Sequence, residues 1–333
     1  LLTNVTFRYV LHTPLVWGDE LASLLFIWLA MLGAVIALQR GEHMRLTVFL
    51  SKMSPERLAF FTTLGHVIVV TFVLMLIGPA WEYTHDELAI TTPALEISNA
   101  IRVASITVGA GLMLALAITR LMEHASLRHL LAAAALVAGI AALLWLGKPL
   151  LVAIGNFNLV LFFLIGVTGM VAMGVPIFVA FGTATLAYLS CMTNAPLTIV
   201  VSRMDEGMSG LILLAVPLFV LLGALIEAMG MAEAMIRFLM TLVGHFRGGL
   251  SYVLIGAMYL VSGISGSKVA DMAAVAPALF PEMKKRGADE GELVAMLSSS
   301  GAMSETIPPS LVLITIGSVT GVSIAALFTG GFM

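Results

Sequence analysis

The stretch SSSGAMSETIPPS, residues 298–310, interrupts an apolar run that extends from Leu293 to Phe328. Pro308 and Pro309 lack an amide hydrogen, and each proline ring clashes with the preceding turn, so an α-helix does not continue through the pair. The carbonyl groups near residues 304–307 are then expected to lose their intrahelical partners. The stretch therefore predicts a helix that breaks in the middle of an apolar segment.

A second interruption lies upstream, in the stretch VSGISGSKVAD at residues 261–271. An apolar run leads into these small polar residues, and another leads away toward Pro281 and the charged segment 282–286. This pattern is typical of a re-entrant helical hairpin with a Ser/Gly tip inside the membrane. Non-helical backbone survives at that depth only where protein buries it or a water-filled cavity faces it.

The composition places these breaks in a membrane. Of the 333 residues, 60% are hydrophobic and 11% are charged, whereas a soluble domain carries about 25% charged residues. A soluble enzyme and a disordered chain are both excluded. The net charge of −3 argues against nucleic acid as a partner, and membrane lipids are the expected surroundings. Alternating ten-residue strands are absent from the sequence, so we predict an all-α polytopic membrane protein, built as a multi-helix bundle.

Apolar runs of about 20 residues mark helices that cross the membrane. We expect spans near Trp17–Leu38, Leu58–Pro79, Ile101–Leu121, Leu130–Leu146, Leu159–Met173 and Pro176–Leu189, and further apolar runs over Leu211–Met229, Ala234–Val243, Gly249–Val261, Val269–Phe280 and Leu293–Phe328. The loop Arg40–Arg57 holds four Lys or Arg residues, whereas the loop Trp81–Ala100 holds four acidic residues and no Lys or Arg. Since Lys and Arg favour the cytoplasmic side, we predict the first loop inside and the second outside.

The two interruptions together predict a transport site. Freed carbonyl and hydroxyl groups replace the hydration shell of a small cation, and helix ends aimed at a break add oriented dipoles. Lys268 and Asp271 lie three positions apart and can pair on one helix face, either as a structural salt bridge or on an ion path. Glu305 lies in the break itself, where an ionisable group favours a role in the path of the ion or substrate. The alternative is that Ser, Gly and Pro merely kink packed helices.

Two classes of enzyme share short motifs with the hairpin tip. GISG at residues 263–266 matches the GxSG of rhomboid-type intramembrane proteases, whose general base is a histidine on a later helix. All seven histidines here precede Ser265. GSK at residues 266–268 has the wrong order and spacing for a phosphate-binding loop. We therefore expect neither an enzyme nor a cofactor.

Several motifs resemble the two membrane subunits of tripartite ATP-independent periplasmic (TRAP) transporters. WGDEL at 17–21, FIWL at 26–29 and RGEHMR at 40–45 resemble the small subunit. SGISGS at 262–267, PEM at 281–283 and IPPS at 307–310 resemble the large subunit. An extra helix around Leu130–Leu146 joins the two parts, as in fused versions of these subunits.

The resemblance implies a bacterial inner-membrane secondary transporter of the elevator type. Such a transporter is driven by a sodium gradient and receives an organic acid (a dicarboxylate, a 2-oxo acid or a sialic acid) from a soluble periplasmic binding protein. It implies scaffold helices over residues 1–126, a connecting helix and loop over 127–154, where the composition also changes near Gly147–Gly155, and the first half of the transport subunit over 155–333. The second inverted repeat of that subunit is expected to lie outside this sequence.

The resemblance also assigns the sodium ligands. The sodium site is expected at the hairpin tip and the proline break, from Ser265, Ser267, Ser304, Thr306, Ile307 and Pro309. The path of the ion or substrate is expected to include Lys268, Asp271, Ser300, Gly301 and Glu305. Two alternatives stay open: within transport, another elevator-type symporter or antiporter that needs no binding protein, and, from a different class, a channel or membrane scaffold.

Overall fold

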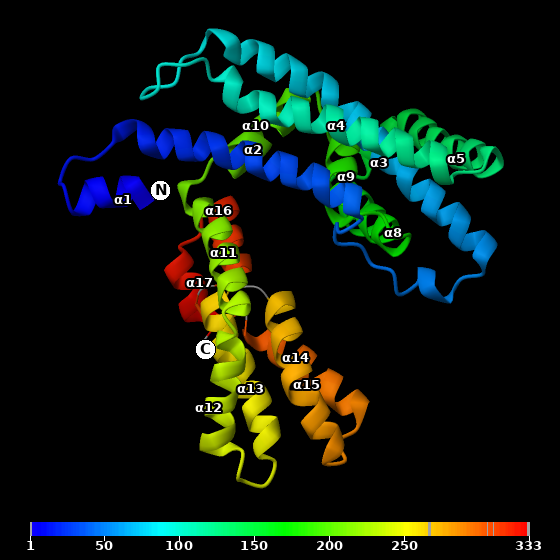
Figure 1. The fold of residues 1–333 in the computed structure, drawn as a ribbon. Coiled ribbons are helices and arrows are strands. Elements are labelled where there is room, and N and C mark those ends of the chain that lie inside the picture. The colour runs from blue at the N-terminus through cyan, green and yellow to red at the C-terminus, as the bar shows by residue number, and fades with distance from the viewer. Residues whose placement is uncertain (1, 266–267, 305, 309, 332–333) are drawn as a thin grey trace. The chain divides into compact units, whose positions relative to one another are not determined.

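The computed structural model describes residues 2–265, 268–304, 306–308 and 310–331. This described part of the chain is helical, and its only β-type pairing is a single bridge between Thr91 and Ser98 (Figure 1). The chain divides into two compact units, Leu1–Met208 and Ser209–Met333, here called unit 1 and unit 2. The prediction of an all-α polytopic membrane protein is confirmed.

Unit 1 contains four helices that are long and apolar enough to cross a membrane, together with shorter segments. Its elements are α1 (Leu2–Tyr9), α2 (Val16–Arg40), η1 (Leu50–Lys52), α3 (Pro55–Asp86), η2 (Glu87–Ala89), α4 (Ala100–His124), α5 (Leu127–Leu146), α6 (Lys148–Ala153), α7 (Phe157–Leu159), the π-helix η3 (Val160–Gly166), α8 (Val167–Ala172), α9 (Ile177–Met192) and α10 (Thr198–Met208). The four long helices α2 to α5 coincide with the first four predicted spans, because the apolar run itself sets the length of each helix.

Local signals set the ends of these helices. Pro55 is the first residue of α3, where its missing amide costs no hydrogen bond. Gly41 ends α2 in the left-handed conformation, at a φ of 72°, and its amide donates to the carbonyls of Ala37 and Leu38. The side chain of Ser126 caps α5 by accepting from the amide of His129.

The core of unit 1 lies between α2, α3 and α4. Helices α3 and α4 run side by side, with α2 against α4 (Figure 1). Ile27, Leu64 and Ile106, one from each helix, are all but fully buried. Helix α9 packs closely on α3: a β-carbon added at Gly182 would lie 2.3 Å from the Phe72 ring.

The prediction of a loop over Trp81–Ala100 is partly wrong. The acidic segment from Trp81 was expected to be loop, but α3 continues through Pro79 to Asp86. Proline is tolerated inside membrane helices because neighbouring groups satisfy the freed backbone. The carbonyl that Pro79 leaves without an amide partner is that of Met75. The Thr84 and Thr107 hydroxyls both donate to a different carbonyl, that of Ala80, directly after the proline.

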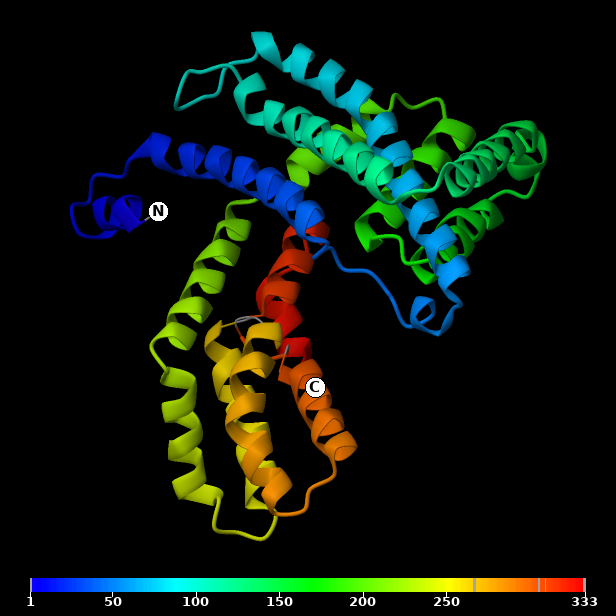
Figure 2. The same ribbon diagram turned by 45° about the vertical axis from the view of Figure 1, so that its right-hand side comes forward.

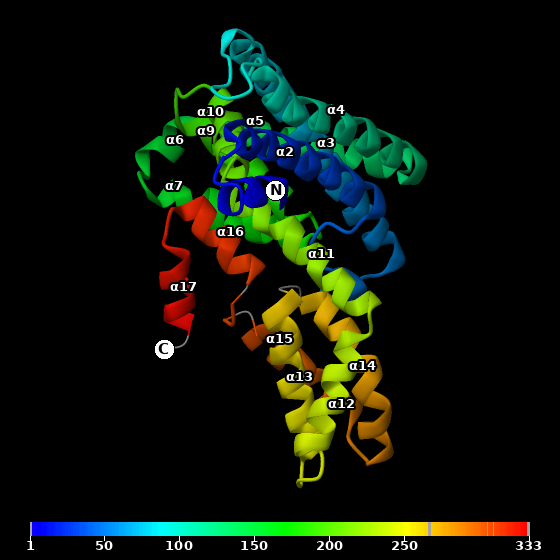
Figure 3. The ribbon, with the colours of Figure 1, turned by 60° about the vertical axis from the view of Figure 1, so that its left-hand side comes forward.

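Unit 2 is a bundle of shorter helices around α13 (Figure 2). Its elements are η4 (Leu211–Leu214), α11 (Ala215–Ala228), α12 (Met231–Val243), α13 (Gly249–Ser265), α14 (Lys268–Lys285), α15 (Glu290–Ser304), α16 (Leu311–Thr320) and α17 (Ile324–Gly331). Helix α13 packs against α12, α14 and α15, and its Leu254 and Met258 are fully buried. Figure 3 shows α16 and α17 as neighbouring short helices at the end of the chain.

Candidate functional site

The proline break predicted from the sequence occurs in unit 2, and the predicted hairpin tip falls on residues 266–267 of the same unit, which lie outside the described residues. Helix α13 ends at Ser265 and α14 begins at Lys268. The 17 residues of α13 span about 25 Å at 1.5 Å per residue, which is shorter than a hydrocarbon core of about 30 Å. Helix α15 ends at Ser304, and α16 begins only at Leu311. The helix through the proline pair is therefore broken, as its local chemistry predicts.

The end of α15 presents a buried polar face. Ser300, Gly301 and Ser304 are all buried. The Ser300 hydroxyl donates to the carbonyl of Met296 at 2.7 Å, and the Ser304 hydroxyl donates to that of Gly301 at 2.9 Å. Each hydroxyl oxygen keeps acceptor capacity after donating its proton, so both remain able to contact a cation.

The break after α15 forms a tight turn. The amide of Thr306 donates to the Met303 carbonyl at 3.2 Å, and the amide of Ile307 donates to the Ser304 carbonyl at 3.1 Å. The Thr306 hydroxyl also donates to the Met303 carbonyl. Ser310 restarts the helix, because its side chain accepts from the Leu313 amide. Glu305 and Pro309 lie outside the described residues.

The hairpin contributes one fully buried carboxylate. Asp271, in the first turn of α14, has an exposure of 0%, whereas Lys268 at the start of that helix is half-buried. Ser267 lies outside the described residues, and Ser265 is placed only by its backbone at the end of α13. A carboxylate this deeply buried is expensive unless polar or charged neighbours compensate it.

The two interruptions lie close together within unit 2. A β-carbon added at Gly263, near the end of α13, would lie 3.6 Å from the side chain of Ile307 in the break. A β-carbon at Gly301 would lie 2.3 Å from Met272, the residue after Asp271. The structure thus brings the Gly301 face of α15 against α14, and the Ile307 turn against the end of α13.

Unit 1 holds a buried ion pair that the sequence analysis missed. Arg102, in the first turn of α4, donates from Nη2 to Oδ2 of Asp205 on α10 at 2.8 Å. The side chain of Asp205 is only 5% exposed. The pair joins residues 103 positions apart. The only signal for it in the sequence is an acidic residue inside the half-apolar segment 198–208.

A second contact in unit 1 holds the loop after α2 against the start of α9. The amide of Ile177 donates to the Met44 carbonyl at 3.1 Å. The His43 ring lies 4.6 Å from that of Phe178. Leu50 packs on Gly174 so tightly that a β-carbon there would lie 2.3 Å from its Cδ1.

Two family models match the two parts of this chain. The small-subunit model, the DctQ component of tripartite ATP-independent periplasmic transporters, matches residues 1–127, and the large-subunit model, the DctM component, matches residues 164–333. The chain belongs to the TRAP transporter family. Its small-subunit and large-subunit parts are fused, and it is a multi-pass protein of the bacterial inner membrane.

Individual relatives have the same fused arrangement or match the large-subunit part. The sialic acid TRAP transporter permease SiaT of Haemophilus influenzae is 28% identical over the whole chain, which covers 56% of that protein. The isethionate TRAP transporter permease DctMQ of Oleidesulfovibrio alaskensis is 27% identical over 96% of this chain and 50% of its own length. The large permease YiaN of Escherichia coli, named for 2,3-diketo-L-gulonate, is 36% identical over 40% of this chain and 31% of its own length. The chain thus spans about half the length of the fused TRAP relatives that it matches. These relatives are permeases and not enzymes.

The TRAP motifs of the small-subunit part hold an acidic loop in place. Glu20, from WGDEL, accepts from the amides of Ala94 and Leu95 at 2.7 and 3.3 Å. Trp28, from FIWL, donates its indole N–H to the Ile101 carbonyl at 3.0 Å. These residues therefore hold the segment between α3 and α4 against α2 and do not belong to the broken-helix site in unit 2.

The two contacts in unit 1 join the fused TRAP parts. Arg102 and the His43–Leu50 loop belong to the small-subunit match, whereas Asp205, Gly174 and Phe178 belong to the large-subunit match.

We expect Gly174→Ala to lower the melting temperature of the purified protein. An L-residue in the left-handed region, here at a φ of 79°, costs about 1–2 kcal/mol, and the added methyl group also overlaps Leu50.

Gly169→Ala is the matched control for that variant. Gly169 lies inside α8 with nothing within 4 Å of an added β-carbon, and alanine favours a helix over glycine by about 1 kcal/mol. The control is expected to leave the melting temperature unchanged or to raise it. Equal melting temperatures for the two variants would mean that the Leu50–Gly174 contact contributes nothing.

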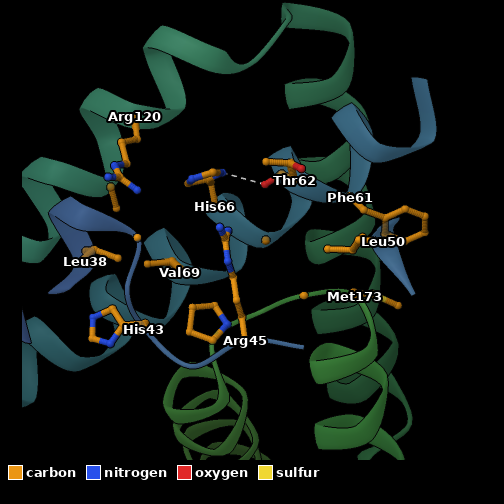
Figure 4. Close-up of a pocket in the computed structure, with 15 residues that line it drawn as sticks. Leu38, His43, Arg45, Leu50, Phe61, Thr62, His66, Val69, Arg120 and Met173 are labelled. Atoms are coloured by element: carbon orange, nitrogen blue, oxygen red, sulfur yellow. Dashed lines mark hydrogen bonds between the residues drawn. The ribbon is translucent and has the colours of Figure 1, made fainter. Parts of the chain in front are cut away.

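His43, which lines a hollow in unit 1 (Figure 4), is expected to make the contact between the loop after α2 and the start of α9 sensitive to pH. Burial lowers the pKa of His43 below its ordinary 6.5, although a hydrogen bond from its Nε2 to the Ala34 carbonyl opposes that shift. As the pH falls below about 6.5, the unfolded state takes up a proton that the folded state resists, so stability decreases. We expect His43→Gln to reduce the loss of melting temperature between pH 7 and pH 5.5, and His85→Gln, at an exposed position, to leave it unchanged. If the melting temperatures of His43→Gln and of the unaltered protein fell equally between pH 7 and pH 5.5, His43 would not be a cause of the acid sensitivity.

Proposed function

We propose that this protein is the membrane component of a sodium-coupled TRAP transporter that imports an organic acid. The proposal depends on one observation: the two interruptions of the apolar helices lie next to each other in unit 2. Interrupted membrane helices supply carbonyl groups and helix ends to ions and substrates in secondary transporters. Unit 2 is then the part that carries the cargo, as an elevator moving against the unit 1 scaffold.

The proposed sodium ligands are oxygen atoms of the hairpin tip and the break. They are Ser265, Ser267, Ser304, Thr306, Ile307 and Pro309. Backbone carbonyls and hydroxyl oxygens suit an alkali cation because they replace its hydration shell without adding a charge. In support, the Ser304 and Thr306 hydroxyls direct their protons to backbone carbonyls and so keep oxygen lone pairs available as acceptors.

The path for the ion or substrate is proposed to include Lys268, Asp271, Ser300, Gly301 and Glu305. Lys268 is the cation of this group, and an anionic cargo needs a compensating positive charge in a membrane interior. The full burial of Asp271 in unit 2 supports its inclusion, because a carboxylate with no function is rarely kept in an apolar bundle. A structural salt bridge between Lys268 and Asp271 is the competing explanation.

The names of the relatives support an organic acid as the cargo. Those relatives are named for sialic acid, isethionate, 2,3-diketo-L-gulonate and C4-dicarboxylates, which are all organic acids. We propose an organic acid cargo and a soluble periplasmic binding protein that delivers it. A transporter that works without such a protein is the alternative.

Uptake by the intact protein in vesicles tests the proposal. Labelled organic acids are supplied with and without an inward sodium gradient, and with and without the periplasmic binding protein. Accumulation that requires both supports the proposal. Accumulation without the binding protein supports the alternative symporter or antiporter, and flux that equilibrates without sodium supports a channel.

A further inference from the structure

Gly301 lies where three helices of unit 2 meet. It is buried near the end of α15, which packs against α13 and α14 (Figure 1). A β-carbon added at Gly301 would lie 2.3 Å from Cε of Met272 on α14 and 3.5 Å from Cε of Met258 on α13. The methyl group of Met272 thus occupies the space that any side chain at position 301 needs.

The contact between Met272 and Gly301 depends on the bare α-carbon of the glycine. Nonbonded carbon atoms attract each other most at about 3.5–4.0 Å, so a methyl group at position 301 requires a displacement of about 1 Å at Met272. Met258 lies at an ordinary contact distance and needs no displacement. If Met272 turned away, it would release the first turn of α14. If it stayed, it would push α14 and α15 apart.

Both sides of this contact carry groups of the proposed sodium site or its path. The Gly301 carbonyl accepts the hydrogen bond from the Ser304 hydroxyl at 2.9 Å, which orients the Ser304 oxygen. Met272 directly follows Asp271, which is fully buried in the first turn of α14. The packing of Met272 on Gly301 therefore joins the segment that bears Asp271 to the segment that bears Ser304.

We propose that Met272 is a positioning residue for the sodium site. It rests on Gly301 and so sets the distance between the first turn of α14 and the end of α15. This inference rests on the proposed function, because Met272 supplies no oxygen ligand of its own. The groups of a binding site must be held within about 0.5 Å of their working geometry, which is less than the displacement that a side chain at position 301 imposes. Gly301 is then required as a spacer and not as a group that touches the cargo.

Moving one methyl group across the contact tests this proposal. Gly301→Ala adds a methyl group close to the place of the Met272 methyl group, Met272→Ala removes the latter, and a double variant combines the two changes. The first measurement is the rise in melting temperature of the intact, purified protein with sodium concentration, which reports the apparent affinity for sodium. Potassium replaces sodium to keep the ionic strength constant. The second measurement is the sodium concentration that gives half-maximal uptake in vesicles.

We expect Gly301→Ala to weaken the apparent affinity for sodium about tenfold, within the range that a misplacement of about 1 Å produces at a positioned site. The double variant is expected to recover most of that loss, because the alanine methyl group then replaces the one that Met272 has lost. The melting temperature without sodium is expected to change little, because the methyl group of Met272 is the flexible end of its side chain and alanine favours a helix over glycine.

Gly256→Ala on α13 is the matched control. A β-carbon there would lie 3.5 Å from the Leu239 side chain, an ordinary contact, so this variant is expected to bind sodium like the unaltered protein. Equal affinities in Gly256→Ala and Gly301→Ala would overturn the positioning role and leave the sodium site standing. A loss in Gly301→Ala that the double variant does not recover would also overturn the role of Met272. If sodium stabilised the unaltered protein no more than potassium does, the proposed function would fail together with this inference.

Discussion

Replacing Asp205 by alanine is expected to destabilise unit 1 by about 3–5 kcal/mol. That is the usual cost of breaking a buried ion pair by removing one partner, because the other charge then stays in a desolvated site. Asp205 is 5% exposed and Arg102 is 24% exposed, so water does not readily replace the lost carboxylate. The measurement is the midpoint of thermal or denaturant unfolding of the detergent-solubilised protein.

Helix α10 supplies its own control for this prediction. Arg203 and Glu206 form an ion pair at 2.7 Å on the same helix, with side-chain exposures of 77% and 68%. Exposed pairs contribute about 0–1 kcal/mol, so Glu206→Ala is expected to change the midpoint little. If Asp205→Ala cost no more than Glu206→Ala, the buried pair would not stabilise the junction between the fused parts.

A double variant separates the charge from the packing. Arg102→Met with Asp205→Leu replaces both ions by apolar groups, and such replacements are often neutral or stabilising. We expect the double variant to recover most of the stability that Asp205→Ala loses. In uptake assays it is expected to retain its dependence on sodium, because the proposed ion site lies in unit 2 and not at this pair.

The crossing helices were predictable because the signal for them is local. An apolar run of a given length fixes α2, α3, α4 and α5 without knowledge of any partner. Pro79 misled the prediction, since the acidic residues that follow it look like loop while the helix continues to Asp86. Helix α10 was also missed: its charged residues 203, 205 and 206 suggest a solvated turn, and only the fold brings Arg102 opposite Asp205.

The candidate site likewise has features that the local sequence predicts and features that it does not. The end of α15 at Ser304 follows from the two prolines, and the hydroxyl bonds of Ser300 and Ser304 reach carbonyls within their own helix. These features depend on neighbours three or four positions away. The contacts of Gly301 with Met272 and of Gly263 with Ile307 depend on how three helices pack, which no short window of sequence encodes.

Replacing both Pro308 and Pro309 by alanine is expected to reduce sodium-dependent uptake at least tenfold while leaving the protein folded. A proline inside a helix is about 3 kcal/mol less favourable than alanine, so the double variant favours a continuous helix from α15 into α16. The new amide at position 308 would then bond to the carbonyl of Ser304, which now accepts from the Ile307 amide. Uptake with and without a sodium gradient is the measurement, beside the melting temperature.

Pro79→Ala is the matched control, because Pro79 lies inside the continuous helix α3. Its replacement also restores an amide to a membrane helix, but no break exists there to be closed, so uptake and its sodium dependence are expected to stay unchanged. A double Pro308/Pro309 variant that melts normally and transports like the Pro79 variant would show that the broken helix does not form the ion site. We expect the double Pro308/Pro309 variant to melt at a higher temperature and to lose sodium-dependent uptake. A continuous helix is more stable, and its carbonyl groups accept hydrogen bonds within the helix and no longer contact the cation.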